Sequence, residues 1–327
     1  MVETRQVSDP MNDTAADMMW ALRTHTRGSA ESLVYERAPV PELAPGEVLV
    51  AVHAVAITYT ELGWDPVWAA PGGGERSAVV PGHEVSGTVS RLGPGAQRFA
   101  IGDEVYGLVD FDRVGAAAEY AAVPEAALAP KPLSASHAES AALALAALTA
   151  WQALVDHAGL AKGERVLVHG GAGGVGVYAV QIAADLGAEV IATGSAERAE
   201  FVRSLGAARY LDYRATAFDR ELSGLDVVLD TVGGDVEARS YEVLRPGGRF
   251  VTVVAPYDAA LAARHKVKAD FFIVRPDGGQ AGKLAAMVDD GTLRPVVAST
   301  FPLSEGRRAF EAAAGSHEPG KIVLQVV

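Results

Sequence analysis

The chain has 327 residues, 49% of them hydrophobic, which is enough to form the cores of two domains of ordinary size. Its formal net charge of −13 argues against nucleic acid or an anionic membrane surface as a partner, since basic patches bind both. It has no cysteine, which excludes disulfides, thiol catalysis and cysteine-ligated zinc or iron–sulfur centres.

The N-terminal residues 1–18 are polar and include several acids. They lack the apolar segment of a secretory signal and the Arg- and Ser-rich composition of a transit peptide, so we expect a disordered lead-in and a cytoplasmic protein. Residues 138–158 are rich in Ala and Leu, but Thr149, Gln152 and Asp156 interrupt them. This pattern predicts a core helix and not a membrane span.

Between residues 19 and 130 the sequence is a series of short strand patterns separated by Pro/Gly turns. The predicted strands cover residues 20–25, 47–53, 84–90, 103–107 and 118–123. Strands at this spacing indicate a compact β-rich domain.

From residue 165 onward, strand and helix patterns alternate. The predicted strands cover residues 166–169, 189–193, 209–213, 226–230, 248–254 and 271–274, and the predicted helices cover residues 177–184, 197–205, 236–244 and 280–290. This alternation predicts an α/β fold with a doubly wound parallel sheet. Strand patterns return at 295–300 and 321–327, which predicts that the tail rejoins the β-rich domain.

A glycine-rich turn at residues 170–176 follows the first strand of this region and precedes a helix. Gly171, Gly173 and Gly176 match the G-x-G-x-x-G pattern of dinucleotide-binding turns in the strand–turn–helix context that it requires. Glycine allows the sharp turn, the close approach to a pyrophosphate at a helix N-terminus and the tight packing of helix on strand. The predicted cofactor-binding residues are Gly171, Ala172, Gly173, Gly174, Val175 and Gly176. The alternative is a tight turn without a ligand.

Several ordered motifs accompany this turn from about residue 19 to the end of the chain. They include Ala44-Pro-Gly-Glu-Val-Leu-Val50, Pro81-Gly-His-Glu84, Gly102-Asp-Glu-Val-Tyr-Gly107, Asp230-Thr-Val-Gly-Gly234, Arg245-Pro-Gly-Gly-Arg249 and Gly320-Lys-Ile-Val-Leu324. With these motifs the chain resembles the medium-chain dehydrogenase/reductase superfamily, in particular its zinc-independent quinone-oxidoreductase branch. The resemblance implies a GroES-like catalytic domain (19–150 and 291–327), a Rossmann nucleotide-binding domain (151–290), an active site between them, a small-molecule substrate and a homodimer.

The same resemblance indicates which residues would have to bind a catalytic zinc ion. Zinc enzymes of this superfamily carry a cysteine where Thr58 stands, a histidine that His83 matches, and a third ligand near Leu145. One remaining ligand does not make a zinc site, because three protein ligands are normally needed. We therefore predict no metal, and we interpret His83 and Glu84 as a pair that stabilises a turn.

The tip of the second parallel strand favours NADPH over NADH. NAD-binding turns usually have an acidic residue about 20 positions on, whereas residues 191–196 contain no carboxylate. Ser195, Arg198 and Tyr213 offer a hydroxyl, a guanidinium and a phenol, which suit a 2′-phosphate, and resembling enzymes use these positions in this way. The alternative is that Arg198 is only a solvated residue on the first turn of a helix.

Further residues are expected near the nicotinamide, because such sheets place ligands at the carboxyl ends of their strands. The strand ends supply Val232, Gly233, Val254, Ala255, Phe272 and Val274, and the resemblance adds Thr149. Two alternatives stay open. The hydroxyl of Thr149 could bond back to the preceding helical turn, and Phe272 and Val274 could belong to a plain core strand.

A nicotinamide cofactor without a metal favours hydride transfer to a carbon that conjugation already makes electrophilic. We therefore predict an NADPH-dependent reductase of a quinone or an α,β-unsaturated carbonyl compound. One alternative is a reductase dedicated to a single biosynthetic intermediate, with a pocket shaped by residues 59–68. Another is a non-catalytic NADPH-binding protein, since fold does not fix function.

The segment after Thr58 supplies the candidate catalytic residues. Since Thr58 stands at the position of the lost zinc ligand, we expect this segment to face the nicotinamide across a cleft from the glycine-rich turn. Tyr59 is the predicted phenol that orients the substrate or relays a proton. Thr60 is an alternative hydroxyl relay, and Glu61 would hold the segment or do acid–base work. The alternative for Tyr59 is a buried aromatic that packs the floor of the cleft.

Overall fold

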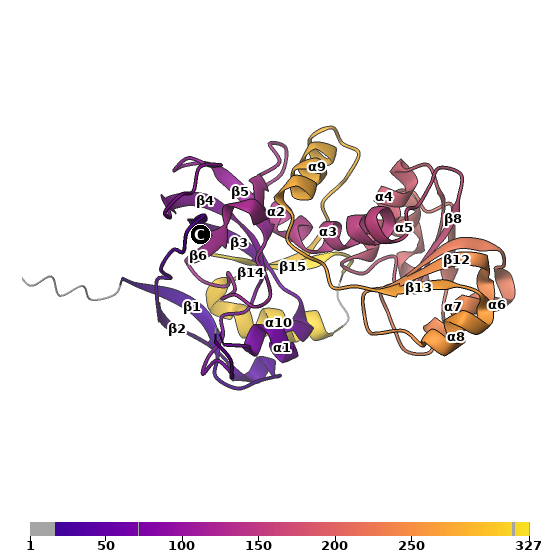
Figure 1. Ribbon diagram of the computed structural model, residues 1–327, viewed down its shortest axis with the longest axis horizontal. Helices are drawn as coiled ribbons and strands as arrows, with labels where there is room; N and C mark the ends of the chain where they lie inside the picture. Colours follow the sequence, from indigo (N-terminus) through magenta and orange to yellow (C-terminus); the bar gives the residue numbers. More distant parts are fainter. Residues whose placement is uncertain (1–16, 71, 316–317, 327) are drawn as a thin grey trace, which may run out of the picture.

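The computed structural model describes residues 17–70, 72–315 and 318–326. It contains two large sheets, each with its own helices, and a long helix that runs between them (Figure 1). Residues 1–16 of the predicted lead-in lie outside the described residues. Strand β1 begins at Met18, the last residue of that predicted lead-in.

The first large sheet is mostly antiparallel and has seven strands, in the order β14-β15-β3-β4-β5-β7 with β6 paired to β3. They are β3 (Glu47–Ala56), β4 (Glu84–Leu92), β5 (Glu104–Leu108), β6 (Tyr120–Pro124), β7 (Leu128–Pro130), β14 (Val297–Pro302) and β15 (Lys321–Gln325). β1 (Met18–Thr24) and β2 (Leu33–Pro39) form a separate antiparallel hairpin. The C-terminal strands β14 and β15, yellow in Figure 1, therefore extend one end of the sheet that the purple N-terminal strands form, with β15 next to β3.

The second large sheet is parallel throughout, with the strand order β10-β9-β8-β11-β12-β13. Its strands are β8 (Arg165–Val168), β9 (Glu189–Gly194), β10 (Arg209–Asp212), β11 (Leu225–Asp230), β12 (Leu244–Thr252) and β13 (Lys268–Phe271). Val166 and Val168 pack in one core with α4 (Gly176–Asp185) and α5 (Ala199–Ser204). Leu167 packs in another core with α7 (Val236–Val243) and α8 (Ala259–His265). Helices thus cover both faces, which confirms the predicted doubly wound sheet.

A long helix from His137 to His157 links the two sheets. It comprises α2 (His137–Ala144), α3 (Ala146–Trp151) and a π-helical end, Gln152–His157. α2 packs against β3 and β4, whereas α3 packs against α4 and α9 (Gly278–Asp289). By length and composition this helix could cross a membrane, but 78% of its most apolar window is buried inside the protein. Such burial is typical of a core helix.

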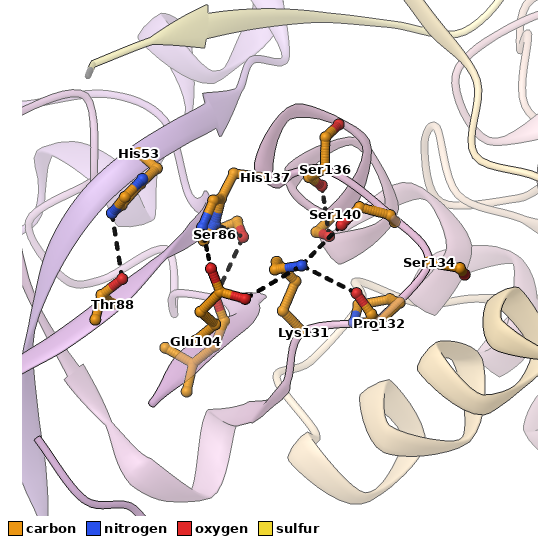
Figure 2. A network of polar contacts seen from close by, with 12 residues as sticks. His53, Ser86, Thr88, Glu104, Lys131, Pro132, Ser134, Ser136, His137 and Ser140 are labelled. Carbon is orange, nitrogen blue, oxygen red and sulfur yellow. Dashed lines mark hydrogen bonds and ion pairs between the residues drawn. The ribbon is translucent and has the colours of Figure 1, made fainter. Parts of the chain in front are cut away.

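Polar side chains fasten the start of α2 to the first sheet (Figure 2). His137 Nδ1 lies 2.8 Å from Ser86 Oγ of β4, and His137 Nε2 lies 3.2 Å from Glu104 Oε1 of β5. The His137 ring stacks on His53 of β3, and Lys131 pairs with Glu104 at 3.4 Å. Burial and the nearby His53 lower the pKa of His137. A neutral His137 therefore suits this structural role.

The structure departs from the sequence predictions in several elements. Helices α8 and α10 (Gly306–Ala314) and strand β2 were not predicted. The buried residues of α10 recur at helical spacing, a signal that the sequence does carry, at Gly306, Ala309, Phe310 and Ala313. The predicted strand at 271–274 is wrong beyond Phe271, where the pairing of β13 with β12 ends. The other short helices are α1 (Asp65–Trp68), α6 (Phe218–Glu221) and the 3-10 turns Ala30–Ser32, Tyr59–Gly63, Glu125–Ala127, Ala196–Arg198 and Leu303–Glu305.

Candidate active site

The glycine-rich turn connects β8 to α4 and leaves no room for a side chain at its tightest point. A Cβ on Gly176 would lie 2.0 Å from the carbonyl oxygen of Gly170, which itself has a φ of +73°. The turn leads into α4, and the first backbone N–H groups of a helix have no partner within it. This local geometry suits a phosphate group.

Lys321, the first residue of β15, connects this turn with the first sheet. A Cβ on Gly174 would lie 3.0 Å from Lys321 Cδ, so the stem of the lysine packs against the turn. Its ammonium donates a hydrogen bond to Thr58 Oγ1 at 2.8 Å and pairs with Glu84 Oε1 at 2.7 Å. The turn and the Thr58 segment therefore lie on either side of one lysine side chain.

Glu84 is one of two buried acidic residues beside Thr58, and Glu61 is the other. The Glu84 side chain is 2% exposed, and burial raises the pKa of its carboxyl, although the adjacent Lys321 ammonium acts in the opposite direction. Thr58 Oγ1 lies 3.2 Å from the same carboxylate oxygen, Oε1. Among the described residues, none hydrogen-bonds to the other oxygen, Oε2.

His83 and Glu84 do not pair with each other, so the prediction of a turn-stabilising pair is wrong. Side chains that are adjacent along extended backbone point in opposite directions. His83 Nδ1 instead lies 2.8 Å from Glu61 Oε2, which also accepts a hydrogen bond from the backbone N–H of Gly82 at 3.0 Å. The backbone N–H of Thr58 donates to Glu61 Oε1 at 3.3 Å. Glu61 is thus buried and holds the segment, the first of its two predicted roles.

The residues at the position of the zinc site do not fit a metal. In the part of the chain that the structure describes, no group of three or more His, Cys, Asp or Glu side chains is placed so that it could hold a metal ion. His83 Nε2 is buried without a hydrogen-bond partner there, but Thr58 and Leu145, which stand at the positions of the other two ligands of the resembling zinc enzymes, cannot complete a tetrahedral set. Thr58 is already engaged by Lys321.

Tyr59 and Thr60 follow Thr58 in the 3-10 turn Tyr59–Gly63, and both are exposed. The Tyr59 side chain is 50% exposed, so it is not the buried aromatic of the packing alternative. Its role toward a substrate stays a prediction, as does that of Thr60.

The predicted phosphate-binding residues lie around the carboxyl ends of β9 and β10. Ser195 accepts hydrogen bonds at its carbonyl from the hydroxyl of Tyr210, at 2.8 Å, and from the backbone N–H of Arg198. The structure adds Arg214, whose Nε donates to the Tyr213 hydroxyl at 3.2 Å. The cluster therefore has two guanidinium groups and two acids, because Arg198 pairs with Glu318 and Arg214 pairs with Glu197 at 3.6 Å.

The residues predicted at the nicotinamide fall into two groups. Val232 and Gly233 follow β11, and their N–H groups both donate to Asp230 Oδ1 at 2.9 Å. A Cβ on Gly233 would lie 2.8 Å from Val254 Cγ1, so these strand ends are adjacent, and Ala255 follows Val254. Val232 and Val254 are 54% and 46% exposed, which leaves apolar surface for a ligand.

The second group is packed into the core. Thr149 is buried and donates its hydroxyl to the carbonyl of Leu145 at 2.7 Å, which is the back-bonding alternative. Phe272 stacks on His157 with ring centroids 4.0 Å apart, and Val274 is also buried. A contact of these three residues with the nicotinamide stays a prediction.

Sequence reasoning missed the roles of Lys321, Glu318 and Arg214. Lys321 belongs to one of the ordered motifs, and a lysine at the start of an otherwise apolar strand was a usable signal. Glu318 had no such signal, because its contact with Arg198 joins residues 120 positions apart. Arg214 directly follows the predicted Tyr213, so a second cation beside that phenol was a usable signal.

Known proteins share this arrangement. Residues 44–133 match the alcohol dehydrogenase GroES-like domain, and residues 205–324 match the zinc-binding dehydrogenase family. The NAD(P)H oxidoreductase RTN4IP1 of Danio rerio is 31% identical over 329 residues, which cover 86% of this chain and 84% of that protein. The chain belongs to the medium-chain dehydrogenase/reductase family.

Other proteins are similar to this chain in sequence or in structure. The spectinabilin polyketide synthase system protein NorB of Streptomyces orinoci is 36% identical over 323 residues, which cover 93% of this chain but 14% of NorB. The quinone oxidoreductase from Coxiella burnetii superposes with a TM-score of 0.88 at 29% identity, covering 95% of this chain and 100% of that chain. The CurK enoyl reductase superposes with a TM-score of 0.84 at 29% identity, covering 94% of this chain and 99% of that chain. The predicted GroES-like and Rossmann fold class is confirmed, and membership makes the chain an oxidoreductase with a nicotinamide cofactor and a small-molecule substrate.

Proposed function

We propose that this chain is an NADPH-dependent, metal-independent reductase of quinones or α,β-unsaturated carbonyl compounds. The observation that carries the proposal is the position of Lys321, which packs against Gly174 of the glycine-rich turn and donates to Thr58 at 2.8 Å. One side chain thereby joins the turn that would hold a dinucleotide to the segment that would face a substrate.

The residues present fit a dinucleotide. The turn offers open backbone for a pyrophosphate, and Lys321 adds an ammonium beside it. Ser195, Arg198 and Tyr213 would hold the 2′-phosphate, with Arg214 as a second cation. Once bound, the nicotinamide would supply a hydride to the substrate.

The proposed substrates match a site whose side chains cannot hold zinc. Conjugation in a quinone or an enone spreads the charge that develops when hydride adds, so a metal is not needed to polarise the carbonyl. The half-exposed phenol of Tyr59 could donate a hydrogen bond to the oxygen that gains this charge. The names of the quinone oxidoreductase from Coxiella burnetii and of the CurK enoyl reductase support this substrate class.

A reductase dedicated to one biosynthetic intermediate is the second candidate. Its support is the 36% identity to NorB, a protein of a polyketide synthase system. A dedicated enoyl reductase would use the same cofactor turn and the same Thr58 segment, and it would differ only in the accepted substrate.

We also propose a homodimer in the cytoplasm. Strand β13 is an edge strand of the second sheet, so its outer side carries unpaired backbone N–H and C=O groups. The nearby Ile273 is 64% exposed. Pairing with β13 of a second copy of the chain would give these backbone groups hydrogen-bond partners and would bury Ile273. Light scattering, together with Ile273→Lys as an interface variant, would test this part of the proposal.

The activity is tested by following NADPH oxidation through the absorbance of the reduced nicotinamide. We expect turnover with simple quinones, enones or enoyl thioesters that is unchanged after chelation of metals. Tight NADPH binding without turnover of any of them would favour the non-catalytic alternative, and turnover of one elaborate thioester alone would favour the dedicated reductase. Loss of activity on chelation that zinc restores would contradict the metal-independent reaction.

A further inference from the structure

One ion pair links the two parts of the molecule at the proposed adenosine end of the cofactor site. Arg198 Nη1 pairs with Glu318 Oε2, and Arg198 Nη2 lies 3.3 Å from Glu318 Oε1. Arg198 ends the 3-10 turn that follows β9 of the second sheet. Glu318 lies just before Lys321, which opens β15 of the first sheet. The contact therefore spans the boundary between the two sheets.

The geometry of this contact matters because a phosphate would use the same donors. A guanidinium binds carboxylates and phosphates through the same planar pair of N–H groups. Glu318 already engages two nitrogens of Arg198 with both of its oxygens. A carboxylate left beside a bound 2′-phosphate would repel it, so Glu318 has to move away when the phosphate binds.

Both side chains are accessible, which allows this exchange. Arg198 is 24% exposed and Glu318 is 68% exposed. Glu197, which directly follows residues 191–196, pairs with Arg214 at 3.6 Å, whereas Glu318 comes from a distant part of the chain and pairs with Arg198. An acid that faces this position from the other sheet is placed to influence which cofactor binds.

We propose that Glu318 is a specificity-determining residue that competes with the 2′-phosphate of NADPH for Arg198. The proposal rests on the proposed NADPH function and names the residue that limits its preference for NADPH. NADH carries a hydroxyl in place of the phosphate and does not need the guanidinium, so its binding is independent of Glu318. Glu318→Gln keeps the size of the side chain and removes its charge.

Adenosine 2′,5′-bisphosphate and 5′-AMP are suitable probes, because they differ by the 2′-phosphate alone. Their dissociation constants and those of NADPH and NADH would be measured by calorimetry for the wild type, Glu318→Gln, Arg198→Ala and the double variant. Glu311→Gln is the matched control, because it removes the same charge from an exposed residue of α10.

We expect Glu318→Gln to tighten binding of the bisphosphate and NADPH about two- to fivefold, the size expected for loss of one partly exposed ion pair. Binding of 5′-AMP and NADH should not change, Glu311→Gln should have no effect, and the gain should vanish in the Arg198→Ala background. That last result separates competition for one guanidinium from a general change in charge.

Three results would overturn the proposal. If Arg198→Ala weakens the phosphorylated probes but Glu318→Gln leaves them unchanged, Glu318 does not compete and the NADPH function stands. If Glu318→Gln weakens 5′-AMP and NADH, the carboxylate accepts a hydrogen bond from the ribose. If Arg198→Ala alters none of the four constants, the assignment of NADPH to this site fails, and the competition fails with it.

Discussion

The ammonium of Lys321 lies 2.7 Å from Glu84 Oε1, and the two side chains are 9% and 2% exposed. Thr58 contacts both partners, so residues from β15, from β4 and from the segment before Tyr59 converge beside the glycine-rich turn. A buried pair is costly to break, because the group that remains keeps an uncompensated charge away from water. The site chemistry and the stability of the fold therefore depend on the same contact.

Lys321→Met should lower the free energy of unfolding by about 3 kcal/mol, since it leaves the Glu84 carboxylate buried without its partner. The double variant Lys321→Met/Glu84→Gln should lose less than the sum of the single variants, because it removes both charges. Urea unfolding of the four proteins gives these values. The exposed pair Arg209–Glu221, at 2.8 Å, is the control, and Arg209→Met should cost at most about 1 kcal/mol. If Lys321→Met and Arg209→Met lowered the free energy of unfolding equally, burial of the ion pair would not matter for stability.

Gly176→Ala should destabilise the turn and abolish cofactor binding. A Cβ there would lie 2.0 Å from the carbonyl oxygen of Gly170, so the backbone has to shift where β8 passes into α4. Gly282→Ala in α9 is the control, because a Cβ there meets nothing within 4 Å. It should raise stability by roughly 0.5–1 kcal/mol through helix propensity. Thermal unfolding and NADPH titration report both effects, and a Gly176→Ala protein that binds NADPH normally would contradict the assigned role of the turn.

Tyr59→Phe should lower kcat/KM roughly tenfold to a thousandfold on the best substrate while NADPH binding stays unchanged. The variant keeps the ring and removes only the hydroxyl that would contact the substrate oxygen. Tyr35→Phe, in the β1–β2 hairpin, is the control and should retain wild-type kinetics. A wild-type rate for Tyr59→Phe would show that the phenol hydroxyl takes no part in the reaction and that solvent supplies the proton.

The parts that the sequence predicted correctly are those with local signals. The glycine-rich turn and the buried strands of the second sheet follow from patterns within a few residues. The contact of Lys321 with Thr58 joins residues 263 positions apart, and no local pattern contains it. The prediction that His83 and Glu84 form a pair failed for another reason. The two residues are adjacent along extended backbone, where consecutive side chains point in opposite directions. Helix α10 was missed although its apolar residues recur at helical spacing.

His169, which precedes the glycine-rich turn, should make the fold sensitive to acid. It is buried between Thr193 Oγ1 and Ser240 Oγ, each 3.0 Å from a ring nitrogen, and burial lowers its pKa to about 4. The unfolded chain, with a histidine pKa near 6.5, therefore binds a proton between about pH 6.5 and 4 that the folded protein excludes. The stability from neutral His169 is fully present above this window and is lost as the pH falls through it.

Integrated from pH 7.5 to 5, this linkage amounts to roughly 2 kcal/mol. We expect the free energy of unfolding in urea to fall by about that much more in the wild type than in His169→Gln, which cannot titrate. His137 has its pKa lowered for the same reason, so His137→Gln should also flatten the pH dependence and provides an independent comparison. Parallel pH profiles for the wild type and His169→Gln would mean that His169 is protonated in the fold or that its unfolded-state pKa is already low. Protonation of His169 in the fold would contradict a neutral histidine held by two hydroxyl groups beneath the cofactor turn.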